Sequence, residues 1–275
     1  MSSPSVPAEV LRSARAYREL TDQAAPGLVE GLYLVGSPIY GDDRPGRSDI
    51  DFVAVLSERP ADHLVRRLGD ALAELGRRHP RPYFDGLQVT RADLAGPPDD
   101  CPDVPCIGEW EFRPAGRLAV DPVTWHELAR GAITVSGPRP GPGDVWTDET
   151  ALRAYSHANL ADYWRPAVEK LRAGQGTVAT GPTERAELMS EWFVLGVARL
   201  HHLLATGRLT SKGGAGRYAL GAFDRAWHPI VTEALRIRNG AGTRSPGYDA
   251  DPAARVRDTI AFAETALEAG LRLGA

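Results

Sequence analysis

Lysine, cysteine and methionine are scarce in this 275-residue chain, and long apolar runs are absent. There are two cysteines and two methionines, and Lys170 and Lys212 are the only lysines. No stretch of about 18 apolar residues occurs, which excludes a transmembrane helix. The opening Met-Ser-Ser-Pro-Ser-Val-Pro lacks the charged and apolar regions of a signal peptide. We therefore expect a cytoplasmic protein without a membrane partner.

A basic excess is also missing. The formal net charge is −4, and 43% of the residues are hydrophobic, as in a globular protein. A protein that grips a nucleic-acid backbone usually presents a strongly basic face. We therefore expect no nucleic-acid partner and a monomer that acts on a small molecule. An acidic chain also tolerates a cationic ligand.

The two cysteines lie in a segment rich in proline and aspartate, residues 95–107. Cys101 and Cys106 are too few to form a structural zinc site, which takes four ligands. A small disulfide between them is one alternative. Reduced thiols are the expected state in a cytoplasmic protein.

The two halves of the chain differ in periodicity. The first half alternates between helical spacing and short apolar runs, with helices expected at 8–24, 60–79 and from Asp121, and strands at 31–36, 50–56, 84–90, 110–112 and 133–136. Beyond the Gly/Pro-rich segment Gly137–Gly143 the spacing is helical, over 148–172, 182–205, 217–223, 227–238 and 252–273. The sequence therefore predicts an α/β (α+β) domain with a small mixed sheet at 1–143, followed by an all-α helical bundle domain at 144–275.

A Gly-Ser pair and two alternating aspartates are attached to the first two expected strands. Gly36-Ser37 follows Leu32–Val35, and Ser48-Asp-Ile-Asp51 leads into 52–56. Strand side chains alternate between faces, so Asp49 and Asp51 point the same way. Two adjacent carboxylates favour a bound cation, and Mg²⁺ prefers oxygen ligands together with substrate phosphates. The alternative is a surface turn followed by a solvated strand end.

This pattern resembles the nucleotidyltransferase superfamily, in which Gly-Ser is followed after a short spacer by Asp-x-Asp on a strand. More closely, the chain resembles the aminoglycoside adenylyltransferases of the streptomycin/spectinomycin type. The resemblance spans most of both domains through Gly36-Ser37, Ser48–Asp51, Gly108-Glu-Trp110, Arg199 and Thr206–Lys212. It implies ATP as substrate, Mg²⁺ bound by Asp49 and Asp51, and transfer of AMP to an antibiotic hydroxyl with release of pyrophosphate.

A catalytic base is expected on the third strand, where the family carries a glutamate. One alignment places Gln88 there, which cannot act as a base, and another places Asp85 there. The two residues are three apart, so they face opposite ways in a regular strand. We favour Asp85 because a carboxylate suits the chemistry. The alternative for Asp85-Gly86 is a turn before the strand.

The remainder of the nucleotide site is expected to come from both domains. The resemblance assigns phosphate contacts to Arg199 and Lys212, next to Gly36, Ser37 and Ser48 from the first domain. Residues 212–216, rich in glycine, are predicted to form a flexible loop, with Arg217 and Tyr218 supporting it. The alternative for Lys212 is an ordinary solvated lysine.

The acceptor is expected to contact an aromatic residue and acidic residues. Trp110 matches a family tryptophan that packs on the aminocyclitol, although a core tryptophan is the alternative. Glu184, Glu187 and Glu191 share one helix face and suit cationic groups, although an exposed helix face is the alternative. Met189 occupies the position of an acidic family residue. Other acceptors, such as a protein hydroxyl or another natural product, and a catalytically degenerate nucleotide-binding module therefore remain alternatives.

Overall fold

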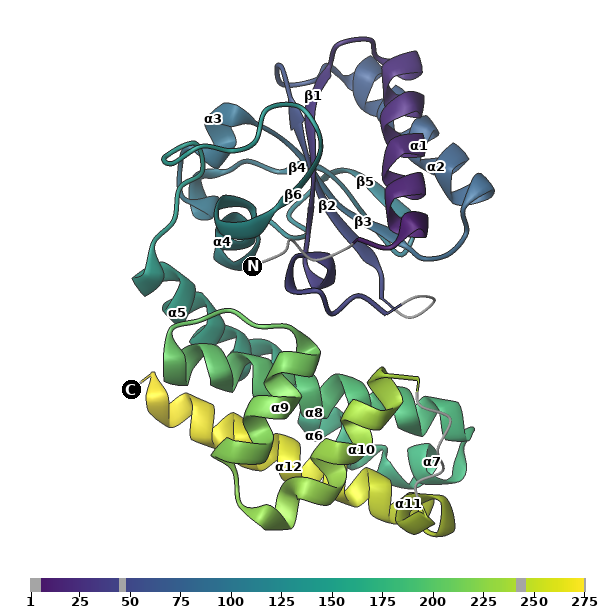
Figure 1. Cartoon of the computed structure of the whole chain (residues 1–275), viewed down its shortest axis with the longest axis vertical. Helices are drawn as coiled ribbons and strands as arrows, with labels where there is room; N and C mark the ends of the chain where they lie inside the picture. The colour runs from purple at the N-terminus through teal and green to yellow at the C-terminus, as the bar shows by residue number, and fades with distance from the viewer. Residues whose placement is uncertain (1–5, 45–47, 241–245, 275) are drawn as a thin grey trace. The chain divides into compact units, whose positions relative to one another are not determined.

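A computed structural model describes residues 6–44, 48–240 and 246–274 of the chain. The chain divides into two compact units, Met1–Asp148 and Glu149–Ala275 (Figure 1). The predicted boundary lies slightly earlier, after Gly143. Val145 is buried in the core of the first unit, and the Trp146 N–H donates to the Leu94 carbonyl oxygen at 2.7 Å. These contacts hold the residues after the Gly/Pro-rich segment on the first unit.

The first unit is built on a mixed sheet. Its strands are β1 (Val29–Val35), β2 (Ile50–Leu56), β3 (Phe84–Thr90), β4 (Val104–Gly108), β5 (Glu111–Gly116) and β6 (Ile133–Ser136). Within the described residues they form one six-stranded sheet in the order β5-β4-β3-β2-β1-β6, in which β2 and β3 are parallel and the other pairs are antiparallel. The predicted small mixed sheet is confirmed.

Helices cover both faces of this sheet (Figure 1). The helical segments are α1 (Ala8–Ala24), η1 (Ser37–Tyr40), α2 (Asp62–Arg78), α3 (Arg91–Leu94), η2 (Pro98–Asp100) and α4 (Pro122–Gly131). Helices α1 and α2 pack on one face around Tyr17, Phe52 and Phe84. Helix α4 packs on the other face through Trp125 and Leu128. Alternation along β2 and β3 supplies both cores, which is why residues 52–56 of β2 form a continuous apolar run.

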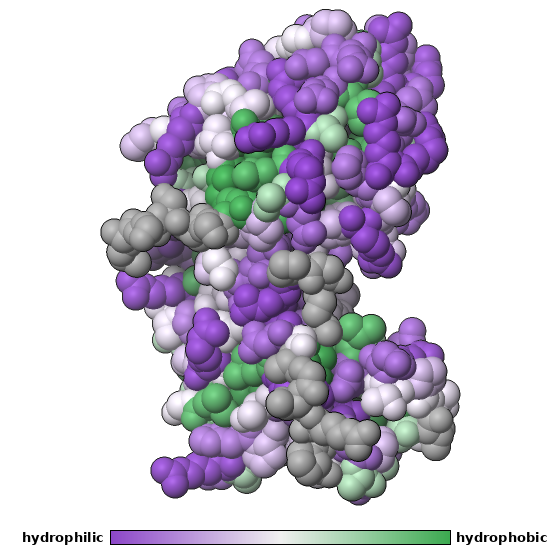
Figure 2. Space-filling model, turned by 45° about the vertical axis from the view of Figure 1, so that its right-hand side comes forward, coloured by the Kyte–Doolittle hydropathy of each residue, from purple (hydrophilic) through white to green (hydrophobic). Residues whose placement is uncertain are grey.

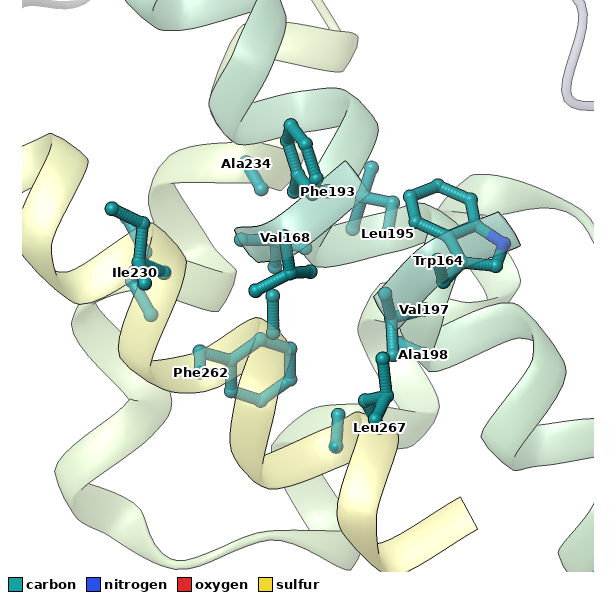
Figure 3. Close-up of a cluster of buried hydrophobic side chains, with 14 of the residues drawn as sticks. Trp164, Val168, Phe193, Leu195, Val197, Ala198, Ile230, Ala234, Phe262 and Leu267 are labelled. Carbon is teal, nitrogen blue, oxygen red and sulfur yellow. The ribbon is translucent and has the colours of Figure 1, made fainter. Parts of the chain in front are cut away.

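The second unit is a helical bundle, as predicted. Its segments are α5 (Glu149–Asn159), η3 (Leu160–Trp164), α6 (Arg165–Ala173), α7 (Gln175–Thr180), α8 (Thr183–Thr206), α9 (Lys212–Ala222), η4 (Arg225–Trp227), α10 (His228–Arg238), α11 (Pro246–Ala250) and α12 (Pro252–Leu273). Helix α8 is central, with apolar residues buried along most of its length. Figure 3 shows the core between α6, α8, α10 and α12, where Trp164, Phe193 and Phe262 lie among smaller aliphatic side chains.

Several predicted local structures were wrong. Strand β4 lies partly within the proline- and aspartate-rich segment 95–107, where no strand was predicted, and α7 lies between the helices predicted at 148–172 and 182–205. The helix expected over 148–172 is interrupted by the π-helical turn η3. Pro166 follows this turn and has no N–H to donate backwards, which accounts for the irregularity.

The predicted flexible loop at residues 212–216 is also wrong, because these residues begin helix α9. Ser211 caps the helix by accepting a hydrogen bond from the Gly214 N–H at 3.0 Å. Gly216 is buried, and a Cβ atom there would lie 2.6 Å from Leu235 and 2.8 Å from Leu195. The glycines therefore permit close packing of α9 against α8 and α10.

Hydrophilic residues cover most of the face shown in Figure 2, with smaller hydrophobic areas between them. Within the described residues, no helix is both long and apolar enough to cross a membrane.

A buried arginine ties α12 to α10. The Arg255 side chain is fully buried, and it donates to Glu233 at 3.0 Å and to Asp249 at 3.1 Å. Replacing Arg255 with alanine is expected to lower the free energy of unfolding by about 3 kcal/mol, because buried carboxylate charge loses a partner. Arg257, two residues along and paired with Asp251 on the surface, is the matched control. Its replacement by alanine is expected to cost less than about 1 kcal/mol in urea-induced unfolding. Equal effects of the two changes would contradict this prediction.

Candidate active site

Two carboxylates lie side by side at the beginning of the parallel strands. Asp51 on β2 is the register partner of Asp85 on β3. The next residues of the same alternation, Val53 and Leu87, belong to the core under α4. Asp51 and Asp85 therefore point to the α4 face of the sheet. Asp49 precedes β2, is exposed, and acts electrostatically on Asp85. The three predicted carboxylates are brought together.

Asp85 has the most unusual electrostatic environment of the three. Burial raises its pKa to about 6, and the negative charges of Asp49 and Glu109 act in the same direction. The backbone N–H of Glu109 donates to Asp85 Oδ1 at 2.9 Å and opposes that rise, as does the positive charge of Arg81. A carboxyl group with such a pKa is poised to exchange a proton near neutral pH.

Gln88 lies on the opposite face of β3. Its side chain is 1% exposed, and its Nε2 donates to the Tyr17 hydroxyl of α1 at 2.8 Å. It belongs to the packing under α1 and α2 and does not reach Asp51. Of the two alignments for the base, the structure places Asp85 beside the Asp-x-Asp pair.

The Gly-Ser turn adjoins the same carboxylates. Gly36 follows the register partner of Asp51 and has φ 68°, a conformation that favours glycine. A Cβ atom at Gly36 would lie 2.1 Å from Asp51 Oδ2, so only glycine fits. The Ser37 hydroxyl donates to Asp43 at 3.4 Å, and the Ser48 hydroxyl accepts from the Arg44 N–H at 3.0 Å. The absence of a side chain at Gly36 thus lets the Asp51 carboxylate approach the backbone of the turn closely.

Glu127 is a further acidic residue at this turn that the sequence analysis missed. It lies on α4, which begins with Asp121 as cap and Pro122 in the first turn. Its side chain is buried and accepts hydrogen bonds from the Gly36 N–H at 2.9 Å and the Tyr40 hydroxyl at 3.0 Å. Glu127 therefore holds the Gly-Ser turn against α4. No spacing signal in the sequence links it to residues so far along the chain.

Trp110 does not join the carboxylates. Its indole Nε1 donates to the Pro80 carbonyl oxygen at 3.1 Å, and its ring packs on the α1/α2 core and meets Tyr83 edge-on. The Gly108-Glu-Trp110 element reaches Asp85 through the backbone of Glu109 instead. The predicted strand at 110–112 begins one residue later, at Glu111, because Glu109 and Trp110 form a turn.

The predicted phosphate-binding residues of the second unit lie on α8 and α9. Arg199 is partly exposed, and within the described part of the chain its side chain makes no hydrogen bond or ion pair. Lys212 is the first residue of α9, and the N-terminus of a helix attracts anionic groups. Arg217 is exposed, whereas the Tyr218 hydroxyl shares a hydrogen bond with His201 Nδ1 at 3.0 Å.

The predicted acidic face of α8 is engaged within the bundle. Glu187 accepts from Arg236 at 2.8 Å, and Glu191 is buried and accepts from Arg238 at 3.2 Å. Glu184 is exposed. The arginines of α10 already compensate the charges of Glu187 and Glu191. A cationic ligand at this face of α8 would have to share the two carboxylates with those arginines.

Carboxylate oxygens, the donors predicted to hold Mg²⁺, gather around Asp51. Asp51 and Asp85 are neighbours across two strands, and the negative charge of Asp49 contributes to the raised pKa of Asp85. Over the described ranges, no group of three or more His, Cys, Asp or Glu side chains is arranged to hold a metal ion. Mg²⁺ is commonly held by one or two carboxylates together with substrate phosphates, and Asp49 and Asp51 suit that role.

The raised pKa of Asp85 predicts an effect on stability. Its folded-state pKa of about 6 exceeds the ordinary aspartate pKa of 3.8. The protonated form therefore stabilises the fold fully below about pH 4, and this contribution is lost as the pH rises through about 6. In metal-free protein, Asp85→Asn is expected to raise Tm relative to the wild type above about pH 6 and to have little effect near pH 4. Thermal melting in EDTA across this range checks it, with Asp70→Asn on the exposed side of α2 as control. A Tm difference for Asp85→Asn that does not vary with pH would contradict the prediction.

A solved structure has the same two-part fold as this chain. The chain is similar to the crystal structure of spectinomycin adenyltransferase AAD(9) from Enterococcus faecialis with ATP and spectinomycin, with a TM-score of 0.64 and 16% sequence identity. The alignment covers 94% of this chain and 98% of that chain. No protein-family model matches the sequence, and a search of curated proteins gives no match. The predicted resemblance is thus confirmed at the level of the fold, over both units.

Proposed function

We propose that this protein is an ATP-dependent nucleotidyltransferase that transfers AMP to a hydroxyl of an aminoglycoside or aminocyclitol and releases pyrophosphate. One observation carries the proposal. Asp51 and Asp85 lie side by side next to the Gly36 turn, in a fold shared with a spectinomycin adenyltransferase. A carboxylate pair at a glycine turn suits phosphoryl chemistry, which depends on positioning and charge compensation.

The three carboxylates divide two roles between them in this proposal. Asp49 and Asp51 would hold Mg²⁺, which when bound would neutralise charge on the phosphates. Asp85 accepts the proton of the acceptor hydroxyl as that oxygen attacks the α-phosphorus of ATP. The hydrogen bond from the Glu109 N–H fixes the orientation of Asp85 and stabilises its ionised form. Glu127 keeps the Gly36-Ser37 turn in place, so that the Ser37 hydroxyl is presented to the phosphates.

The second unit contributes cations to the triphosphate. Two observations support this role. The Arg199 side chain makes no hydrogen bond or ion pair within the described residues, and Lys212 lies at the N-terminus of α9. Ser48, Arg217 and Tyr218 are secondary members of the nucleotide site.

The acceptor is proposed to be a hydroxyl-rich small molecule of the streptomycin or spectinomycin class. The solved structure that shares the fold contains spectinomycin, and this chain has a net charge of −4, which suits a cationic ligand. Glu187 and Glu191 contribute negative charge to acceptor binding while they remain paired with Arg236 and Arg238. We propose that the protein acts as a cytoplasmic monomer.

Incubation with α-labelled ATP, Mg²⁺ and a panel of aminoglycosides and aminocyclitols tests the function. Labelled AMP on one or more acceptors, together with released pyrophosphate, is the expected result. The Asp51→Asn variant is the matched control and is expected to give neither. Pyrophosphate release without antibiotic labelling would point to another hydroxyl acceptor. ATP binding without any transfer would indicate a degenerate nucleotide-binding module.

Lys212→Ala is expected to weaken binding of ATP by about tenfold, because one charge-assisted contact to the triphosphate is lost. Isothermal titration with a non-hydrolysable ATP analogue and Mg²⁺ measures this. The other lysine, Lys170, is exposed on α6, and Lys170→Ala is the matched control with unchanged affinity. Equal affinities of both variants and the wild type would place the phosphates away from α9.

A further inference from the structure

The loop between β4 and β5 has an unusual backbone. Gly108 and Glu111 are register partners, so only Glu109 and Trp110 form the turn. Both have positive φ, 51° and 65°, as in a type I′ hairpin turn. Such turns strongly favour Asn-Gly, and a bulky residue with positive φ is an outlier that costs free energy. The surrounding structure must therefore hold this turn in place.

The Trp110 side chain supplies that restraint. Its indole N–H is bonded to the Pro80 carbonyl oxygen at 3.1 Å, and its ring meets Tyr83 at 6.4 Å between centroids. The ring also covers Gly76 of α2, where an added Cβ atom would lie 3.0 Å from the indole. Gly76 thus leaves room for the indole, and Trp110 is fastened to α2 and to the segment before β3.

The turn held in this way delivers one contact to the carboxylate cluster. The Glu109 N–H lies 2.9 Å from Asp85 Oδ1. We propose that Trp110 is a positioning residue: by anchoring a strained turn to α2, it aims the Glu109 N–H at the Asp85 carboxylate and fixes the orientation of that carboxylate. This proposal rests on the proposed function for its catalytic consequence, and it assigns Trp110 a role other than direct contact with the acceptor.

Two variants separate positioning from ligand contact. Trp110→Ala removes the anchor and leaves an alanine where φ is positive. The double variant Glu109→Asn/Trp110→Gly also lacks the indole, but its sequence favours the type I′ turn by itself. A positioning role predicts that the double variant recovers what Trp110→Ala loses. An acceptor-contact role predicts that both variants are equally impaired.

The first measurement uses the free protein and needs no substrate. Amide hydrogen exchange at residue 109, followed by NMR, is expected to accelerate at least about tenfold in Trp110→Ala and to return towards the wild-type rate in the double variant. Amides of β2 report whether the sheet remains folded. Unchanged exchange at residue 109 in a folded Trp110→Ala protein would overturn the proposal. If that variant does not fold, the double variant decides: a wild-type exchange rate at residue 109 supports the proposal, and fast exchange overturns it.

The second measurement separates kcat from the acceptor KM. Trp110→Ala is expected to lower kcat by about 10–100-fold with acceptor KM within about twofold of wild type, and the double variant to restore most of kcat. A raised acceptor KM in both variants would assign Trp110 to the acceptor site and overturn the proposal. If the wild-type protein transfers no AMP, the proposed function fails, and the exchange measurement alone decides the positioning role.

Discussion

Asp51→Asn is expected to abolish AMP transfer while leaving the fold intact, and Asp49→Asn to do the same. Each change removes one of the two carboxylates proposed to hold Mg²⁺ and so removes charge compensation at the developing pyrophosphate, typically several kcal/mol of transition-state stabilisation. Asp51 is the more constrained of the two, because it lies between Gly36 and Asp85. Pyrophosphate release measured with a saturating acceptor gives the loss of activity.

The control for this prediction is Asp70→Asn, an identical change on the exposed side of α2. Circular dichroism and Tm show whether each variant is folded. Near-normal turnover in Asp49→Asn or Asp51→Asn would remove the Asp-x-Asp pair from the catalytic site. A loss of activity in Asp70→Asn would show that the assay reports general stability.

Asp85→Asn is expected to lower kcat by about 10²–10⁴-fold with little change in ATP affinity, because general-base assistance is lost while charge contacts to the phosphates remain. Asparagine retains an oxygen that can accept the Glu109 N–H, so the local structure is preserved. Single-turnover kinetics at saturating ATP and acceptor measures the chemical step.

Gln88→Ala is the contrasting change on the same strand. It leaves the buried Tyr17 hydroxyl without its partner and is expected to cost about 1–3 kcal/mol of stability, with kcat within a few-fold of wild type. An essential Gln88 together with a dispensable Asp85 would contradict the assignment of the base.

The main elements around the site follow from local patterns. The apolar run before Gly36 and the run after Asp51 predict two strands, and the structure has β1 and β2 there. The period of two along a strand also predicts that Asp85 and Gln88 face opposite ways. Helices α1 and α12 have the predicted bounds, because their apolar spacing and, for α12, the Asp251 cap act within one helical turn.

Local patterns mislead where packing reverses a propensity. The glycines of 212–216 suggest flexibility, but in α9 Gly216 removes side-chain bulk so that α9 can approach Leu195 on α8 and Leu235 on α10. The Glu109-Trp110 turn has no turn-forming residue in either position, and its conformation depends on a tryptophan ring packed against a distant helix. A propensity assigned to one residue carries no information about such partners.

Other features of the site are decided by tertiary structure alone. Glu127 meets Gly36 from a position 91 residues along the chain, and Glu191 meets Arg238 from 47 residues away. Which face of β3 carries the proposed base depends on α1 covering Gln88 and leaving Asp85 beside Asp51. Sequence by itself determined the strands β1, β2 and β3, the paired aspartates and the two-part architecture, because these arise from interactions between near neighbours. Only the folded chain decided which carboxylates are adjacent and which are neutralised by arginine, since burial and pairing depend on residues that the chain brings together from far apart.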